Sequence, residues 1–385
     1  MAFQLGRALR HRNYRLFFTG QAISLIGTWL TRFATIWMVY KLTHSGVFLG
    51  LVAFCSQAPA SLCAPLAGVL VDRWDRHRVI VATQIAAMLQ SAALAFFAFS
   101  GLMTVWHLMV LGGIQGVINA FDMPARQAFL GQMIEDRADL PNAIALNSSL
   151  VNLARLLGPT FAAALVAWTN EAWCFAIDSA SYLAVIASLL VMRVAKRPAR
   201  VRSGHVWSEM RDGWRYIARA PLVHAVLLLL VTSSVLAGSY TTLLPLLVGN
   251  PHGLGILMAA GGLGALCGAL YLASRSTIVG LGRVLVRCGL GLGVGLIALR
   301  FAPSLWIMAP IVFGVGACLM VQMASTNTIV QTVVDPDKLG RVMSMYAVAF
   351  FGGAPIGALL QGVLADQVGA GNTFVCAGLG TLVCA

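Results

Sequence analysis

The eleven residues GVLVDRWDRHR, at positions 68 to 78, decide how this chain folds. They gather two acidic side chains, three arginines and a histidine, while the stretches on either side are almost free of charge. Ionised side chains are costly in hydrocarbon, so a chain that concentrates them in one short loop has the pattern of a protein that crosses a bilayer. We therefore predict that residues 68–78 form the turn between two membrane-spanning helices.

The composition supports a membrane protein. Of the 385 residues, 59% are hydrophobic and only 10% are charged, whereas a soluble domain carries roughly a quarter charged residues. No water-soluble fold could hide this much apolar surface, so the surplus must face lipid. The eight cysteines occur singly, with no CxxC pair or Cys/His cluster. This usage indicates neither a zinc site nor a disulfide framework, and we expect no metal and no cofactor.

Apolar runs set the number of predicted spans. A span needs about 20 apolar residues, and eleven runs are long enough, while a twelfth has 14 residues and is predicted to be a short or truncated helix. The basic start of the chain resembles a signal peptide, but no small-residue cleavage site follows promptly, so we expect an uncleaved first helix. The predicted spans are residues 14–40, 46–71, 79–100, 103–121, 142–168, 172–192, 221–248, 253–274, 283–301, 305–334, 341–365 and 372–385.

The basic residues predict the orientation. If the spans alternate in direction, 22 of the 26 lysines and arginines fall on one side of the membrane. The positive-inside rule places that side, with both termini, in the cytoplasm. The net charge of +13 is thus explained by topology, and no nucleic-acid partner is needed. We expect a multi-pass monomer in the cell inner membrane, with the lipid bilayer as its surroundings.

A polar interval divides the chain into three predicted parts. Residues 1–193 are predicted to form a six-helix bundle, residues 194–220 a basic cytoplasmic linker, and residues 221–385 a second bundle. The linker contains an amphipathic helix that suits the membrane surface or the bundle ends. A regulatory partner docking there is the alternative. The apolar face of that helix consists of Val206, Trp207, Met210, Trp214 and Ile217.

The two halves repeat each other at an offset of 200 residues. The matching pairs include Gly68 with Gly268, Trp106 with Trp306, Gly116 with Gly316, and Glu135 with Asp335. Two parallel six-helix bundles related by a pseudo-twofold axis are a transporter architecture, with the substrate path between them. The predicted fold class is therefore an all-α polytopic membrane protein.

The loop at 68–78 also carries a family resemblance. Gly68, Asp72, Arg73, His77 and Arg78 resemble the signature loop of the major facilitator superfamily. Asp75 stands where that signature usually has a second glycine, so the turn must be made in another way. YRLFFTGQAISLIGTW, DMPARQAFLGQMI and NAIALNSSLVNLARLLGP are similar to the transmembrane secretion effector family, which includes enterobactin exporters and macrolide efflux proteins. The resemblance implies that fold and a transport function.

The resemblance further implies a gating latch. The carboxylate of Asp72 would contact the start of the eleventh span near Gly340 and Arg341, where the helix macrodipole favours an acid. Gly68 is expected to let neighbouring helices approach closely. The alternative is a loop that only sets topology. The corresponding loop of the second half, between the eighth and ninth predicted spans, has Leu272 and Ala273 instead of Asp and Arg, which predicts asymmetric gating. The predicted latch residues are Gly68, Asp72, Arg73, Arg76, Arg78, Asp122, Arg126 and Arg341.

Three charged residues lie deep inside predicted spans, away from their ends: Arg32, Arg155 and Asp178. Each would cost at least ~2.5–3.5 kcal/mol facing lipid at the membrane centre, so each should face a cavity or a partner. The arginines are candidates to bind an anionic or polar substrate group, although Arg155 could instead bond carbonyls or Asn147 and Asn152. Asp178 is either a proton carrier or the partner of a permanent salt bridge to Arg32 or Arg155. Gln115, Asn119 and Asn152 are further candidates for the substrate and proton pathway.

These observations predict a secondary active transporter. It would export a small amphipathic molecule, siderophore-like or drug-like, by alternating access in exchange for protons. No Walker A motif occurs, which argues against direct ATP drive. His107 and His224 lack an acid or cysteine partner at a telling spacing, so no enzyme site is indicated. The alternatives are an uptake transporter, a lipid or lysophospholipid flippase, and a non-transporting scaffold or sensor.

Overall fold

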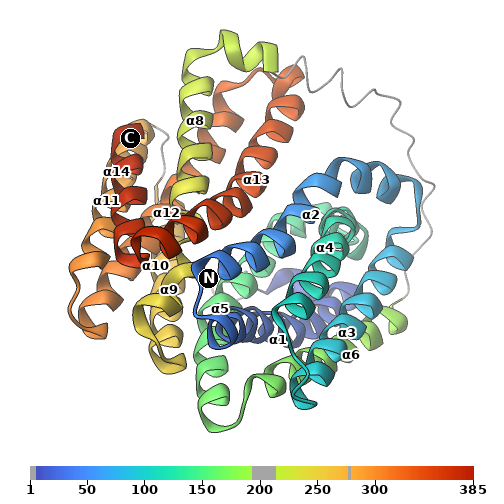
Figure 1. Ribbon diagram of the computed structural model, residues 1–385. Helices are drawn as coiled ribbons and strands as arrows, with labels where there is room; N and C mark the ends of the chain where they lie inside the picture. The colour runs from blue at the N-terminus through green and yellow to red at the C-terminus, as the bar shows by residue number, and fades with distance from the viewer. Residues whose placement is uncertain (1–5, 193–213, 276–278) are drawn as a thin grey trace. The chain divides into compact units, whose positions relative to one another are not determined.

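The computed structural model describes residues 6–192, 214–275 and 279–385, and every regular element in these ranges is a helix (Figure 1). Eleven of the described helical segments are long and apolar enough to cross a membrane, and a shorter apolar helix follows them. The prediction of eleven full spans and a short last one is therefore confirmed. The first helices are η2 (Arg7–Arg10), α1 (Arg12–Thr43), α2 (Gly46–Arg73), α3 (Arg76–Phe99), α4 (Val105–Met133), η3 (Arg137–Asp139), α5 (Leu140–Trp168) and α6 (Glu171–Val191).

The second set of helices follows the linker. It comprises α8 (Pro221–Leu236), α9 (Tyr240–Val248), α10 (Pro251–Ala273), α11 (Leu281–Phe301), α12 (Leu305–Val333), α13 (Pro336–Val368) and α14 (Ala370–Cys384). The bounds of α4 and α12 lie 200 positions apart at both ends, which matches the offset seen in the sequence. Most of the predicted linker helix lies outside the described residues. Of its apolar face, Ile217 is buried and Trp214 is exposed.

The chain divides into two compact units. Unit 1 comprises Met1–Met38 and Leu62–Arg202, and unit 2 comprises Val39–Ser61 and Ser203–Ala385. Helices α1 and α2 thus contribute residues to both units. The predicted division into 1–193, 194–220 and 221–385 stays a prediction.

In unit 1, α3 packs against both α4 and α6. A core at one end of the unit contains Tyr14, Phe17, Ile80, Phe129 and Leu189, which are almost completely buried. Asn170 begins α6 by accepting a hydrogen bond from the Ala172 amide. Such an acceptor satisfies one of the free N–H groups of a helix start. Asp75 at the start of α3 and Asn250 at the start of α10 are caps of the same kind.

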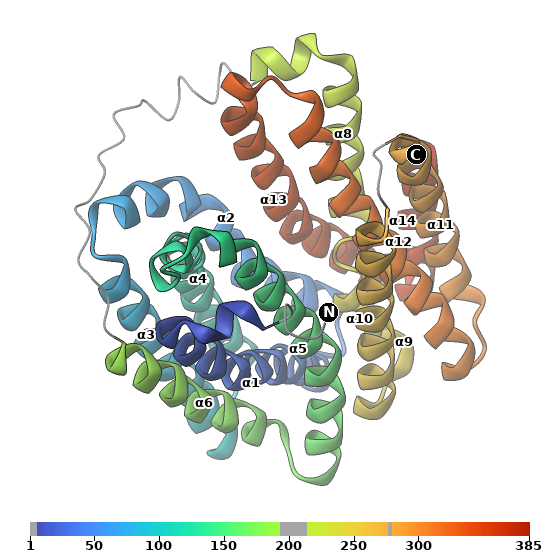
Figure 2. The ribbon, with the colours of Figure 1, turned by 180° about the vertical axis from the view of Figure 1, so that it is seen from behind.

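Unit 2 is built on close contacts between helix backbones. Helix α12 packs against α10 and α11, and α11 packs against α14 (Figure 2). A Cβ atom at Gly264 of α10 would overlap the carbonyl oxygen of Phe313, and one at Gly316 of α12 would overlap that of Gly261. Small residues let membrane helices approach at backbone distance, where dispersion contacts are densest. The glycine-rich runs of the second half are therefore packing surfaces.

Residues 39–61 join unit 2 through an acid at a helix start. The carboxylate of Asp366 on α13 accepts hydrogen bonds from the Gly46 and Val47 amides and from the Ser45 hydroxyl. These amides are at the N-terminus of α2, where a negative charge is favoured by the free N–H groups and the macrodipole. A Cβ atom at Gly50 would overlap the Ala358 carbonyl oxygen, so α2 and α13 continue in close contact beyond this cap.

The span predicted at 221–248 is interrupted between α8 and α9. The Gly238 amide donates back to the Ser233 and Ser234 carbonyls, and the helix restarts at Tyr240. Gln361 of α13 donates its Nε2 to the Val235 and Leu236 carbonyls, at 2.8 and 2.9 Å. An interruption at membrane depth requires such partners for the backbone groups it frees. The break is therefore stabilised by a side chain of another helix.

Helix α4 extends well past the predicted end at residue 121. The apolar run stops at Asp122, but the helix continues to Met133 through Pro124. Arg126, one turn after Asp122, pairs with its carboxylate at 2.5 Å. The charge that ended the predicted span is thus neutralised within the same helix.

Candidate functional site

Two of the in-span arginines meet at one aromatic ring in unit 1. The Cζ atom of Arg32 lies 5.0 Å from the ring centroid of Trp29, and that of Arg155 lies 5.6 Å from the same centroid. A guanidinium within about 6 Å of an indole face is attracted by the ring quadrupole. The structure therefore places both arginines at the same ring, although they lie far apart in the sequence. Trp29 was missed as a site residue, although it stands three residues before Arg32 on one helix face.

A glycine brings Arg155 to this ring. A Cβ atom at Gly158 of α5 would overlap the Cβ of Trp29 on α1. Gly158 lies three residues after Arg155, so the same face of α5 carries the close contact and the cation. Gly158 and Pro159 are both buried. The LGP motif at 157–159 thus positions α5 against α1, and this contact places two cations around one indole.

Asp178 is enclosed by three helices of unit 1. Its side chain on α6 is 2% exposed, and Ser91 on α3 donates a hydrogen bond to Oδ2 at 2.7 Å. On the α1 side, a Cβ atom at Gly27 would lie 2.7 Å from Asp178 Oδ1 and 2.6 Å from the Ser181 hydroxyl. The acid thus sits among hydroxyl groups and the backbone of α1. Whether it carries a proton or forms a lasting salt bridge stays a prediction.

The three amide candidates bond within their own helices. Gln115 donates its Nε2 to Asn119 Oδ1 at 3.1 Å along α4. Asn152, one of the expected partners of Arg155, donates instead to the Ser148 carbonyl at 3.0 Å. Asn119 is exposed, and Gln115 and Asn152 are half-buried. These amides therefore place polar atoms at or near the surface of unit 1. Their role in the substrate and proton pathway stays a prediction.

Part of the predicted latch is a buried network between α3 and α4. Asp122 accepts hydrogen bonds from Thr83 Oγ1 and Gln84 Nε2, both at 2.8 Å, and pairs with Arg126. The expected association of Asp122 with Arg126 is therefore present within unit 1. The side chain of Asp72 lies outside the described residues, so its contact with the start of the eleventh span stays a prediction.

Asp75 explains how the signature turn forms without a second glycine. Its Oδ1 accepts hydrogen bonds from the His77 and Arg78 amides, at 3.0 and 3.3 Å, which makes it the N-cap of α3. An Asp at this position satisfies amides that the first turn leaves free. The departure from the family signature is thus a helix cap, and it ends the turn before α3.

The close helix approach expected at Gly68 stays a prediction. A Cβ atom there meets no described atom within 4 Å. Its repeat partner Gly268 does make such an approach, because a Cβ atom would lie 2.7 Å from the Ala317 carbonyl oxygen. A glycine in the sequence permits a close contact without requiring one, and the packing around each helix decides where it forms.

An ion cluster around Asp139 was not predicted. This fully buried carboxylate pairs with Arg7 at 2.8 Å and Arg10 at 2.7 Å, and His11 Nε2 lies 3.0 Å from it. The hydrogen bond with His11, helped by the charges of Arg10 and Arg7, holds the pKa of Asp139 below its ordinary value despite burial. The acidic residues at 134–142 indicate that a basic partner is needed, but the sequence does not show which one, because Arg7 and Arg10 lie over 120 residues away. The cluster fastens the N-terminal segment to the start of α5.

Comparison with known proteins places this chain among transporters. A family model described as transmembrane secretion effector matches residues 7–385. The chain is 26% identical to the staphyloferrin A transporter of Staphylococcus aureus, over 96% of this chain and 93% of the relative. It is 25% identical to macrolide efflux protein A of Streptococcus pyogenes, over 96% and 94%. It is also 25% identical to the enterobactin exporter EntS of Shigella boydii, over 97% and 90%.

Solved structures show the same fold at low sequence identity. A bacterial homolog of the human lysosomal transporter Spinster aligns with a TM-score of 0.72 and 14% identity, covering 97% of this chain and 95% of that one. The nucleoside transporter NupG aligns with a TM-score of 0.73 and 13% identity, covering 99% and 98%. The predicted all-helical transporter fold is therefore confirmed.

Proposed function

This chain belongs to the transmembrane secretion effector family of the major facilitator superfamily, and we propose that it exports a small amphipathic anion. It is a multi-pass membrane transporter and not an enzyme. Its relatives are named as a siderophore transporter, a siderophore exporter and a macrolide efflux protein. Export proceeds by alternating access in the inner membrane, with both termini in the cytoplasm, and is coupled to protons.

The arrangement of Arg32, Trp29 and Arg155 is the observation that carries this proposal. Two guanidinium groups can bind carboxylate or other oxyanion groups with charge-assisted hydrogen bonds. The indole between them offers an apolar face to the rest of the molecule. A ligand that satisfies both is amphipathic and anionic, as a siderophore with free carboxylates would be.

A deletion strain tests the substrate class. Cells that lack the protein should accumulate, or become sensitive to, its substrate in a screen of siderophores and antibiotics. Restoring wild-type protein should reverse the effect. R32Q and R155Q should restore it poorly for anionic substrates and well for uncharged analogues. Equal loss for both kinds of substrate would reject anion recognition by the two arginines.

Asp178 is the proposed proton carrier. An ionised carboxylate buried among uncharged groups is costly, so a protonated and a deprotonated state suit different surroundings. Ser91 can donate to the carboxylate and can also accept a hydrogen bond from the carboxylic acid. The hydroxyl therefore serves both states as the transporter changes conformation.

Inverted membrane vesicles test the coupling. Adding substrate should move protons in the wild type and in the control D136N, whose carboxylate is exposed and outside the spans. D178N should bind substrate but move no protons. Unchanged coupling in D178N would clear Asp178 of this role, and no substrate-dependent proton movement at any pH would reject antiport itself.

The latch is proposed to regulate which side opens. In this proposal Asp72 contacts the start of the eleventh span near Arg341 and so stabilises the outward-open state. The pair Asp122–Arg126 keeps α4 in contact with α3. D72N should shift the resting population towards inward-open, as measured by spin-label distances. No change in the distance distribution would leave residues 68–78 as a topology signal alone.

A further inference from the structure

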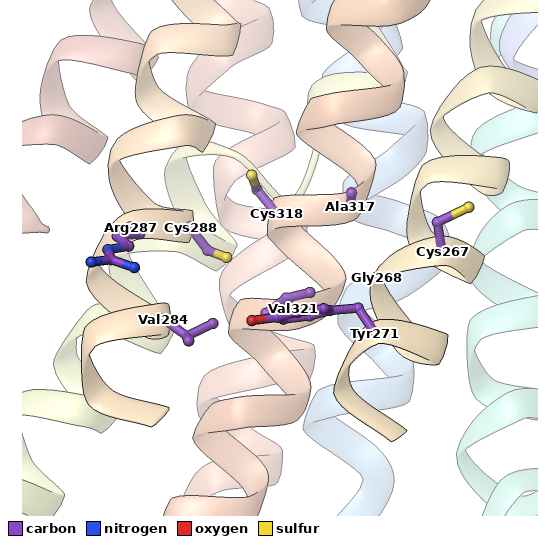
Figure 3. A pocket seen from close by; sticks show the side chains of 9 residues that line it. All are labelled: Cys267, Gly268, Tyr271, Val284, Arg287, Cys288, Ala317, Cys318 and Val321. Atoms are coloured by element: carbon purple, nitrogen blue, oxygen red, sulfur yellow. The ribbon is translucent and has the colours of Figure 1, made fainter. Parts of the chain in front are cut away.

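A groove in unit 2 lies between α10 and α11, with α12 as its floor (Figure 3). Helix α12 packs against both neighbours, so its residues close the groove from behind. The cavity volume is about 340 Å³, at the low end of the ~300–1,000 Å³ typical of ligand sites. Most of the lining is apolar or thiol. It consists of Cys267, Gly268 and Tyr271 from α10, Val284, Arg287 and Cys288 from α11, and Ala317, Cys318 and Val321 from α12.

Two polar side chains line the groove, Tyr271 from α10 and Arg287 from α11. Arg287 is exposed there, and within the described part of the chain it has no hydrogen bond or ion pair. The Tyr271 hydroxyl accepts a hydrogen bond from Arg275 at 3.1 Å. Its own hydrogen is left to donate, because a phenol can do both. The groove therefore has both a cation and an O–H donor in its lining.

In the part of the chain that the structure describes, Arg275, Arg283 and Arg287 form no ion pair. The sequence contains no Asp or Glu between Pro251 and Val334, a stretch that includes all three helices of the groove. Arg275, Arg283 and Arg287 all lie at the end where α10 stops and α11 begins. The groove thus combines an apolar lining within the membrane-spanning region with several positive charges near the end where α10 stops.

We propose that this groove binds an anionic phospholipid of the leaflet at the 273–281 end of unit 2. One acyl chain lies in the channel between α10 and α11. The phosphate accepts hydrogen bonds from Arg287 and from the Tyr271 hydroxyl. Basic pockets between transmembrane helices are suited to acidic head groups, since desolvated charge pairs are stronger there than in water. The inference holds whatever the exported substrate is.

Such a lipid would stabilise unit 2. Ligands that bind only the folded state raise its stability by mass action. The acyl chain would fill the space between two helices that both rest on α12, and the head group would bridge α11 to the Tyr271–Arg275 pair of α10. An anionic lipid should therefore raise the unfolding temperature more than a neutral lipid of equal chain length.

Native mass spectrometry of the full-length protein tests the site. Delipidated protein in neutral detergent is mixed with equal amounts of phosphatidylglycerol and phosphatidylcholine of the same chain length. The wild type should retain phosphatidylglycerol several-fold over phosphatidylcholine. R287Q should lose that preference. The matched control R283Q removes the same charge from the same helix, one turn away and outside the lining, and should keep it.

Thermal unfolding in the same mixtures gives the second readout. Phosphatidylglycerol should raise the unfolding temperature of the wild type and R283Q, and should raise that of R287Q by less than half as much. Equal losses in R287Q and R283Q would mean general surface attraction and would overturn the site. Equal stabilisation by phosphatidylcholine would overturn the anionic preference, and displacement of phosphatidylglycerol by transported substrate would overturn the lipid as occupant.

Discussion

The two units have interiors of different chemistry. Unit 1 buries four carboxylates, Asp122, Asp139, Glu171 and Asp178, whereas the buried polar side chains described in unit 2 are all serines, threonines and glutamines. Unit 2 relies instead on glycines that let helix backbones touch. Buried charges need partners and respond to protonation. Backbone contacts do neither. Among the described residues, the buried side chains that can bind a proton as carboxylates therefore lie in unit 1, while the acid of unit 2 described above, Asp366, is exposed.

Two repeat-related positions show how the units diverged. Asp122 of α4 and Gln322 of α12 stand 200 positions apart, and both are buried. Asp122 pairs with Arg126 and with two side chains of α3. Gln322 donates its amide to the Ser233 hydroxyl at 2.7 Å. The same place in the repeat thus holds an ion network in unit 1 and a neutral hydrogen bond in unit 2.

The largest effect is expected from filling a glycine contact in unit 2. In G264A the new Cβ would overlap the Phe313 carbonyl, so α10 and α12 must separate. Overpacking of this kind costs about 3 kcal/mol or more when backbone is in the way. The control G314A on α12 places its Cβ in open space. Unfolding in detergent should be much easier for G264A, and equal stability of the two variants would contradict backbone packing as the basis of unit 2.

The next effect concerns charge in unit 1. D139N removes the acid that Arg7, Arg10 and His11 surround, so its unfolding temperature should fall clearly at pH 7. The pKa of Asp139 is lowered in the folded state. Its stabilisation is therefore present above the unfolded pKa of about 3.9 and is lost as the pH falls through the folded value. The difference in unfolding temperature between the wild type and D139N should therefore become smaller at acidic pH.

One control makes this test specific. D136N removes an exposed acid that pairs with Arg10 at 3.3 Å and accepts a hydrogen bond from the Ala138 amide, and it should change the unfolding temperature little. Calorimetry from pH 3 to pH 8 would follow both variants. A gap for D139N that stays constant across this range would show that its carboxylate stabilises unit 1 by packing alone.

A smaller loss of stability is expected at Gly158, where unit 1 also has a close helix contact made by a glycine. G158A should push Trp29 away from α5 and cost about 1–3 kcal/mol, as overpacking usually does. G131A, on α4 of the same unit, has no described atom within 4 Å of its new Cβ and is the matched control. Thermal unfolding would compare them. If G158A were as stable as G131A, the contact between α1 and α5 would be loose enough to yield.

The smallest effect is expected at the helix cap. D75A leaves the first amides of α3 without their acceptor and should cost about 1 kcal/mol. D75N keeps a side-chain oxygen and should cost less. Unfolding temperatures of the two variants would decide. A loss as large in D75N as in D75A would mean that the negative charge, and not the cap, stabilises this turn.

The helices and the charged residues inside them could be predicted because the membrane requires long apolar runs, and these are visible in short stretches of sequence. Apolar runs fix the spans, and Arg32, Arg155 and Asp178 stand out against hydrocarbon. Contacts between distant segments leave no such local pattern. The pairing of Asp139 with Arg7 joins residues more than 130 positions apart.

The interruption between α8 and α9 escaped prediction for a related reason. Residues 221–248 read as one apolar run, and the group that satisfies the broken backbone, Gln361, lies 125 positions from Leu236. Gly68 and Gly268 show a second limit, because both are glycines at matching positions and the close contact that is described lies at Gly268. Composition tells where a contact could form, and only the fold tells where it does.

The unequal placement of buried charge has an electrical consequence. An energised membrane does about 2.3 kcal/mol of work on each elementary charge that crosses 100 mV. Asp178 on its helix in unit 1 lies within that field. The polar side chains described as buried in unit 2 carry no charge for the field to act on. An ionised Asp178 would therefore experience the membrane voltage, whereas the buried polar side chains described in unit 2 would not.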